Sequence, residues 1–209
     1  MLQGFVASLP TESAREKALQ ARLRWIAHCA FLTGLRISEL AQAKMGDIEY
    51  RRRGSHESWW IEVRGKGDKQ RLVPLSDDFL EELRAYREHL GLSPRPVRGE
   101  SQPLISRLGN AATPIKVQRL HGLIKYLFEQ TADVLEREGE PNRASAVRQA
   151  SMHWLRHTFA KNALEAMTPV EVQKMMGHAD LTTLSIYADA EDERLYDHAR
   201  HSIKKNRES

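Results

Sequence analysis

The sequence predicts a mixed α+β fold that is mainly helical, with a small antiparallel β-sheet or hairpin near residues 48–75. Helices are indicated because apolar residues recur every three or four positions through much of the chain. Strands are indicated by residues 59–63 and 71–75, which are rich in tryptophan, isoleucine and valine and flank a turn that contains glycine. The 209 residues are enough for one sizeable core. We therefore expect a main domain over residues 1–190 and a C-terminal helix or tail over residues 191–209.

Composition narrows the class of protein. The chain has 32 Lys and Arg against 28 Asp and Glu, a formal net charge of +4, which permits nucleic-acid binding without requiring it. The single cysteine, Cys29, excludes an intramolecular disulfide framework and fits a reducing compartment. No apolar run is long enough for a membrane span. These features predict a cytoplasmic protein with no membrane partner.

The first helices are predicted from an apolar stripe and from their end signals. The stripe begins after Ser13, and Gly34 ends it. Arg36 opens a second helix, which we expect to end near Gly46. Arg36 is compatible with an ordinary surface position, but a phosphate at that place could use both its guanidinium and the backbone N–H groups of the helix start.

The predicted hairpin carries lysines at its turn. Residues 65–69 read Gly-Lys-Gly-Asp-Lys, which is not the spacing of a phosphate-binding P-loop. An ordinary polar hairpin tip explains Lys66 and Lys69 on their own. The run Arg51-Arg52-Arg53 lies before the tryptophan-rich strand and suits either a solvated loop or a phosphate contact.

The middle of the chain is predicted to be helix, loop and helix. Apolar spacing indicates helices over residues 79–90 and 113–138, and Leu104-Ile105 suits a short strand between them. Gly, Ser and Pro make residues 91–103 a loop. The second helix bears four cationic or imidazole side chains, which suit either a helix lying along a DNA groove or a solvated face: Lys116, Arg119, His121 and Lys125.

The last third of the chain gathers groups suited to phosphate chemistry. His153 and Arg156 are three residues apart and therefore share one face of a helix. Thr168-Pro169 predicts the start of a short helix that Gly177 ends, so that His178 follows a helix terminus. Tyr187 lies near the end of another predicted helix. A phenol with a pKa of about 10 needs help with its proton and a positive cradle before it can attack phosphate.

These motifs resemble the tyrosine recombinase (phage integrase) family. His153-x-x-Arg156-His157, Gly177-His178 and Tyr187 follow the family's order and similar spacing. The family's upstream arginine matches Arg36 in the box Thr33-Gly34-Leu35-Arg36, and its hairpin lysine matches Lys66. The resemblance covers the chain from about residue 20 to 190 and implies the fold of that family's catalytic domain.

The resemblance implies that the chain cuts and rejoins DNA without a metal, a cofactor or ATP. Tyr187 would attack a backbone phosphate and form a 3′-phosphotyrosine, while Arg36 and Arg156 clamp the non-bridging oxygens. His178 would donate to the same phosphate, and His153 would assist transfer of the tyrosine proton.

In the same family picture, Lys66 acts as general acid on the leaving 5′ oxygen. Arg36, Lys66 and Arg156 would also bind DNA. Lys69 and Arg71 are candidates for contacts to the DNA backbone. Partners implied by the resemblance are double-stranded DNA and further copies of the chain, as a tetramer on DNA, with a monomer compatible when DNA is absent. The family usually has an N-terminal core-binding domain, and we expect this sequence to lack it.

Other interpretations remain open from the residues alone. His153 and His157 are four apart, as zinc-binding histidines on a helix can be, but Trp154 follows where a His-Glu-x-x-His motif has glutamate and no third ligand is obvious. A type IB topoisomerase-like enzyme shares the chemistry but rejoins the original strand. A catalytically silent DNA-binding relative would not need Tyr187.

Overall fold

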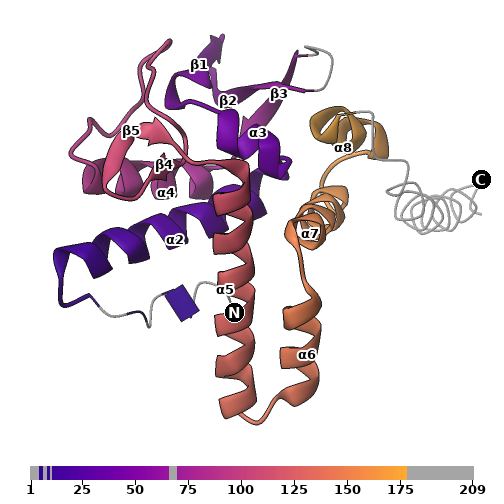
Figure 1. Ribbon diagram of the computed structural model, residues 1–209. Helices are drawn as coiled ribbons and strands as arrows, with labels where there is room; N and C mark the ends of the chain where they lie inside the picture. Colours follow the sequence, from indigo (N-terminus) through magenta and orange to yellow (C-terminus); the bar gives the residue numbers. More distant parts are fainter. Residues whose placement is uncertain (1–4, 7–8, 10, 66–69, 178–209) are drawn as a thin grey trace, which may run out of the picture. The chain divides into compact units, whose positions relative to one another are not determined.

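The computed structural model describes residues 5–6, 9, 11–65 and 70–177 (Figure 1). The chain divides into two compact units, Met1–Phe159 and Ala160–Ser209. The boundary falls inside helix α7 (Met152–Leu164). The predicted boundary at residue 190 lies outside the described residues, so the division into a catalytic domain and a C-terminal tail stays a prediction.

Helix α2 (Ala14–Thr33) has the ends that the sequence predicts. Ser13 caps its first turn, with the Glu16 carboxylate returning to the Ser13 backbone, and Gly34 ends it with a φ of 59°. A positive φ favours glycine because a side chain there meets the backbone. Both ends of this helix are therefore determined locally by the residues at its caps.

Helix α4 (Asp77–His89) packs against α2 through aromatic side chains. The ring of Trp25 lies 5.2 Å from Phe79 and 5.4 Å from Tyr86, measured between centroids. Its indole Nε1 donates to the carbonyl oxygen of Leu104 at 2.7 Å. Burying these rings while satisfying the indole N–H fixes the loop after α4 against the core.

Helix α3 (Ile37–Gln42) is shorter than predicted. Ala43 leaves the helix with a ψ of 148°, and the 3-10 helix η1 (Met45–Asp47) follows. The expected end near Gly46 is therefore four residues late. Backbone bonds to another segment explain the difference, because Met45 and Gly46 donate their N–H groups to Gln102 and Glu100 instead of continuing the helix.

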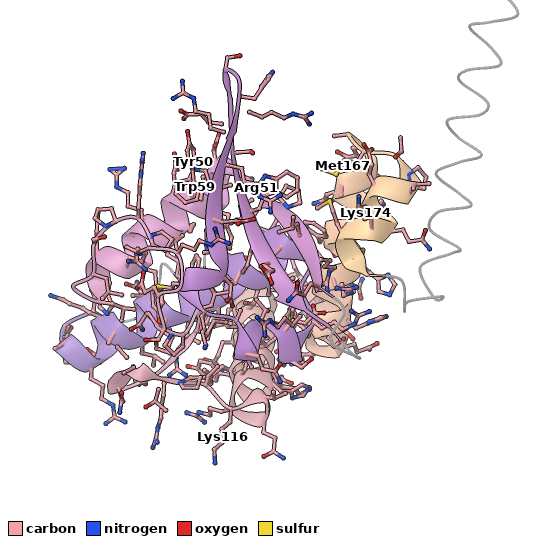
Figure 2. All side chains as sticks on the ribbon, turned by 90° about the horizontal axis from the view of Figure 1, so that it is seen from above. Tyr50, Arg51, Trp59, Lys116, Met167 and Lys174 are labelled. Carbon is pink, nitrogen blue, oxygen red and sulfur yellow. The ribbon has the colours of Figure 1, made fainter. Side chains whose placement is uncertain are left out.

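Three antiparallel strands form the main sheet in the order β1 (Ile48–Arg53), β2 (His56–Arg64) and β3 (Gln70–Leu75). β2 and β3 pair from Trp59↔Leu75 to Arg64↔Gln70, which confirms the predicted hairpin. The run Arg51–Arg53 is strand rather than loop, because it pairs with the start of β2. Figure 2 shows the β1–β2 ribbon extending past the helices, with Tyr50, Arg51 and Trp59 labelled on it.

A second, two-stranded sheet precedes the longest helix of the described residues. It joins β4 (Ser106–Arg107) to β5 (Asn110–Pro114). The predicted strand at Leu104-Ile105 was wrong, because these two residues form a bend and the strand begins at Ser106. The expectation that Thr113 begins a helix was wrong, because Pro114 pairs with Ser106 and the next N–H, of Ile115, bonds to Ile105. Helix α5 (Val117–Arg137) begins only after this pairing.

Helix α6 (Pro141–Gln149) folds back beside the second half of α5 (Figure 1). Its small apolar face is buried against α5 in a cluster of Ala132, Leu135, Ala144 and Val147. Arg148 donates to Asp133 at 2.7 Å and to Glu136 at 2.6 and 2.8 Å. Residues 141–149, which follow the predicted helix over residues 113–138, are therefore the second arm of a helical hairpin.

Helix α8 (Pro169–Met176) has the predicted start and stop. Thr168 caps it, with Glu171 bonding back to the Thr168 backbone, and Gly177 follows with a φ of 77°. Among the described helices, none combines the length and the apolar character needed to cross a membrane.

Candidate active site

The turn between α2 and α3 is held by Thr33 and Gly34. The Thr33 hydroxyl donates to the Cys29 carbonyl at 2.6 Å and accepts the Leu35 N–H at 3.3 Å. A Cβ at Gly34 would lie 2.3 Å from Cδ1 of Phe159. Glycine is therefore needed here twice, for its backbone conformation and for the close approach of α7.

Arg156, near the end of the first unit in the sequence, binds this turn near its beginning. Its side chain is buried, and its Nη1 donates to the Gly34 carbonyl oxygen. The contact joins positions that are 122 residues apart in the sequence. Because Arg36 follows Gly34 by two residues, this bond brings the two motifs that carry the predicted arginines into one region.

Arg36 is the N-cap residue of α3, where its backbone N–H donates to Oε2 of Glu39 at 2.7 Å. Its Nη1 lies 3.2 Å from Oε1 of the same carboxylate. The Arg36 side chain is 31% exposed. The N-terminus of a helix is electropositive, so the guanidinium and the helix start together favour an anion at this place.

Glu39 is a buried carboxylate shared by two arginines. Arg71, on β3, donates Nη1 to Oε1 at 2.7 Å and Nη2 to Oε2 at 2.8 Å. Burial alone raises the pKa of Glu39, but the bonds from Arg71 and from the Arg36 backbone, together with both guanidinium charges, outweigh burial and hold that pKa below its ordinary value. Glu39 is thus ionised at neutral pH.

The structure gives Arg71 an internal partner. Its side chain is 11% exposed and both terminal nitrogens point at Glu39. The predicted DNA contact of Arg71 stays a prediction. Our sequence interpretation assigned no site role to Glu39, although its position three residues after the N-cap Arg36 is the spacing of a capping box.

His153 and His157 face each other across one turn of α7. Their Nε2 atoms are 2.5 Å apart and their rings are nearly perpendicular, with centroids 4.2 Å apart. At this separation one nitrogen donates and the other must accept with its lone pair, so the contact holds a single proton. His153 is exposed on the same helix that carries Arg156.

The described residues contain no group of three side chains placed to hold a metal ion. Within that part of the chain, no third side chain lies where it could bind zinc together with His153 and His157.

Four predicted site residues lie outside the described residues: Lys66, Lys69, His178 and Tyr187. The flanking elements are described, because β2 and β3 pair on either side of the lysine-bearing connection and α8 ends just before His178. Arg36, Arg71, His153 and Arg156 are the predicted residues that the structure places.

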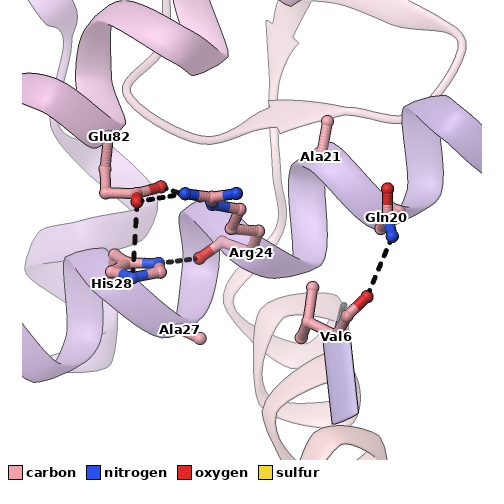
Figure 3. A pocket seen from close by; sticks show the side chains of 7 residues that line it. All are labelled: Val6, Gln20, Ala21, Arg24, Ala27, His28 and Glu82. Atoms are coloured by element: carbon pink, nitrogen blue, oxygen red, sulfur yellow. Dashed lines mark hydrogen bonds and ion pairs between the residues drawn. The ribbon is translucent and has the colours of Figure 1, made fainter. Parts of the chain in front are cut away.

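A hollow of about 400 Å³ lies on another part of the first unit (Figure 3). Helix α2 provides most of its lining, with Val6 and Glu82 completing it, and none of the predicted site residues lines it. Arg24 donates Nε and Nη2 to Glu82 at 2.7 and 2.6 Å. Because this pair neutralises itself, the hollow does not offer a net charge to a phosphate.

Comparison with known proteins decides the family. The model of the phage integrase family matches residues 6–194, which is most of the chain. The chain belongs to the phage integrase family. That assignment agrees with the resemblance carried by Arg36, Arg156 and Tyr187.

Curated relatives of this integrase-family chain are tyrosine recombinases of bacteria. XerD of Mycobacterium tuberculosis H37Rv is 33% identical over 189 residues, which cover 90% of this chain and 52% of the relative. XerC of Xylella fastidiosa is 29% identical over 180 residues, covering 86% and 51%. The chain therefore spans about half the length of the curated relatives it matches.

Solved structures confirm the fold class. The XerH recombinase in a pre-cleavage complex with its difH substrate matches with a TM-score of 0.59 and 23% identity, covering 90% of this chain and 47% of XerH. The post-cleavage complex gives 0.57 and 22%, covering 95% and 49%. A mainly helical α+β domain with small antiparallel sheets is thus shared with a recombinase that was crystallised on DNA.

Proposed function

We propose that this chain is the catalytic domain of a site-specific recombinase that cuts and rejoins double-stranded DNA. The observation that carries the proposal is the bond from Arg156 to the Gly34 carbonyl, which brings two distant arginine motifs together. Family membership supports the same reaction class. Relatives crystallised on their DNA sites support DNA as the partner.

In this proposal, the reaction exchanges one phosphodiester for another. The phenol oxygen of Tyr187 forms a bond to phosphorus while the bond from phosphorus to the 5′ oxygen breaks. His153 assists removal of the phenol proton, and Lys66 gives a proton to the leaving oxygen. A 5′-hydroxyl of another strand then attacks the phosphotyrosine in the reverse sense, so no ATP, metal or cofactor is required.

The arginines supply the positive charge that the transition state needs. Arg36 and Arg156 clamp the non-bridging oxygens, and His178 donates to the same phosphate. Burial of Arg156 and its bond to a backbone carbonyl orient the guanidinium before DNA arrives, which is the condition for electrostatic stabilisation to lower a barrier. Arginine suits this task because its charge is permanent and its donors are forked.

DNA contacts extend beyond the reacting phosphate in this proposal. Lys116, at the N-cap of α5, and Arg119, His121 and Lys125, on the helix, are exposed and suit a groove-facing helix. Lys69 is a further candidate for the DNA backbone. The functional assembly is a tetramer on DNA and the protein works in the cytoplasm, on the nucleoid. We expect this chain alone to bind DNA weakly and to lose affinity steeply with salt.

Covalent trapping tests the proposal. The protein is mixed with fragmented genomic DNA of its source, denatured, and the DNA that stays linked to protein is sequenced. Adducts with the wild type that are absent with Tyr187→Phe are expected. Adducts that persist in Tyr187→Phe would move the nucleophile elsewhere.

The same preparation separates the related reactions. Recombination between two copies of the recovered site is expected. Relaxation of supercoiled plasmid without exchange would instead support a topoisomerase-like enzyme. Binding without adducts, unchanged by Tyr187→Phe, would support a silent relative.

A further inference from the structure

We propose that Arg71 is a positioning residue: it acts as the counter-charge of Glu39, so that the charge of Arg36 serves the DNA phosphate instead of the carboxylate. The inference deepens the proposed function and rests on it. It assigns Arg71 a role inside the protein in place of the DNA contact that the sequence predicts.

The contacts around Glu39 are unequal. Arg71 offers the carboxylate two nitrogens at 2.7 and 2.8 Å, in the forked arrangement that is strongest for this pair. The Arg36 side chain offers one nitrogen at 3.2 Å, and the other Arg36 contact, at 2.7 Å, comes from its backbone. Arg71 thus makes the shorter and more numerous charged contacts.

The burial of these three side chains also favours Arg71 as the main charged partner of Glu39. Side-chain exposure is 4% for Glu39, 11% for Arg71 and 31% for Arg36. A carboxylate this buried needs a positive partner, because an unpaired charge in the interior is costly. The more buried arginine meets that need, whereas Arg36 is the more accessible of the two to a molecule arriving from solvent.

Loss of Arg71 would transfer this task to Arg36. Glu39 would then face Arg36 as its remaining charged neighbour among these contacts, and the Arg36 guanidinium would be drawn toward the carboxylate. A displacement of about 1 Å in a reacting constellation can lower a rate by about 100-fold. Removing the carboxylate charge together with Arg71 would remove that pull.

The test measures single-turnover formation of the protein–DNA adduct. The probe is a duplex that carries the sequence recovered by covalent trapping. Arg71→Gln is expected to slow adduct formation by about 100-fold. The double variant Glu39→Gln/Arg71→Gln is expected to recover at least about tenfold of that loss, because both charges of the pair are gone.

A matched control uses another forked pair of the same unit. Arg24 contacts Glu82 at nearly the same distances but lies among residues that line the hollow. Arg24→Gln is expected to stay within about twofold of the wild type, because surface pairs contribute little and this one touches no site residue. An equal loss in Arg24→Gln would overturn the inference.

A double-mutant cycle between Arg36 and Arg71 measures their coupling, which a purely structural role of Arg71 would not produce. If Arg71 acts through Arg36, Arg36→Gln/Arg71→Gln is no slower than Arg36→Gln alone. On a duplex with a neutral methylphosphonate at the cleaved position, the Arg71→Gln defect should shrink together with that of Arg36→Gln. Additive losses in the cycle would overturn the inference.

Two further results separate the failures. If Arg71→Gln does not fold, Glu39→Gln/Arg71→Gln is compared with Glu39→Gln, where matching rates support the inference and a further loss of about tenfold overturns it. No wild-type adduct in the covalent trapping experiment, which precedes this test, would overturn the proposed function itself. If the wild type forms the adduct but Glu39→Gln/Arg71→Gln is no faster than Arg71→Gln, the role of Arg71 alone is overturned.

Discussion

The forked pairs Arg71–Glu39 and Arg24–Glu82 are built from the same two residue types at similar distances, yet their surroundings differ. The paired atoms are 2.7 and 2.8 Å apart in the first and 2.7 and 2.6 Å apart in the second. Exposure of the two side chains is 11% and 4% in the first pair, but 58% and 14% in the second. Distance alone therefore does not tell what a pair does for the protein.

Burial changes the stability cost of removing one residue of an ion pair. In an exposed pair the surviving charge returns to water, so the net effect is small. In a buried pair the surviving charge has no solvent to turn to and either destabilises the fold or recruits another partner. Beside Glu39 the other partner is Arg36, a candidate catalytic residue, which is why the first pair matters for chemistry.

The largest expected effect is on stability. Glu39→Ala leaves Arg71 buried without its carboxylate and should lower the free energy of unfolding by about 3–5 kcal/mol. Glu82→Ala, at the exposed pair, should cost about 0–1 kcal/mol. Urea unfolding followed by circular dichroism measures both. Similar losses for the two variants would remove the distinction between the pairs.

Packing beside the buried pair is tested next. Gly34→Ala places a Cβ 2.3 Å from Phe159 at a φ of 59°, whereas Gly91→Ala, at a φ of 71°, meets no atom within 4 Å. The backbone penalty is common to both variants. Gly34→Ala should therefore exceed Gly91→Ala by about 1–3 kcal/mol in thermal unfolding, the usual cost of overpacking. Equal costs would show that α7 moves away without loss.

The pH dependence sharpens the role of Glu39. Its pKa is lowered from 4.5 in the folded protein, so its ionised form adds stability above the unfolded value, and that stability is lost as the pH falls through the lower folded value. The stability difference between the wild type and Glu39→Gln should be constant above pH 4.5 and shrink below it. Unfolding curves across this range measure it, and a difference that grows at acidic pH would contradict the sign.

The smallest expected effect is that of salt concentration on the stability contributed by each pair. Raising KCl from about 0.05 to about 0.5 M shortens the screening length and should reduce the stability difference between the wild type and Arg24→Gln by a few tenths of a kcal/mol. The difference between the wild type and Glu39→Gln should change less, because low exposure limits screening. Thermal unfolding at both salt concentrations provides the comparison.

Elements with local end signals were predictable from sequence. Ser13 and Gly34 bound α2, and Thr168 and Gly177 bound α8, because a capping side chain or a positive φ acts within one turn. Elements that depend on distant pairing were not. The strand at Arg51–Arg53 and the early residues of the expected helix at Thr113 are decided by the strands opposite them.

The same division applies to the site. Residue types, their order and the family resemblance made Arg36 and Arg156 candidates, and their catalytic roles stay predictions. The partnership of Glu39 with Arg71 spans 32 residues, and spacing carries no signal for it. The carbonyl that receives Arg156 could not be named from sequence for the same reason, since it lies 122 residues away.

The bond between Arg156 and Gly34 also has a consequence for how the protein folds. Closing a loop of 122 residues costs chain entropy, and contacts of such separation form late relative to local helices and hairpins. A chain on the ribosome, or one partly folded, can hold α2 and α3 before α7 docks. Such a chain has not yet joined the Arg156 motif to the Gly34 turn, so the candidate site is complete only after the first unit has folded.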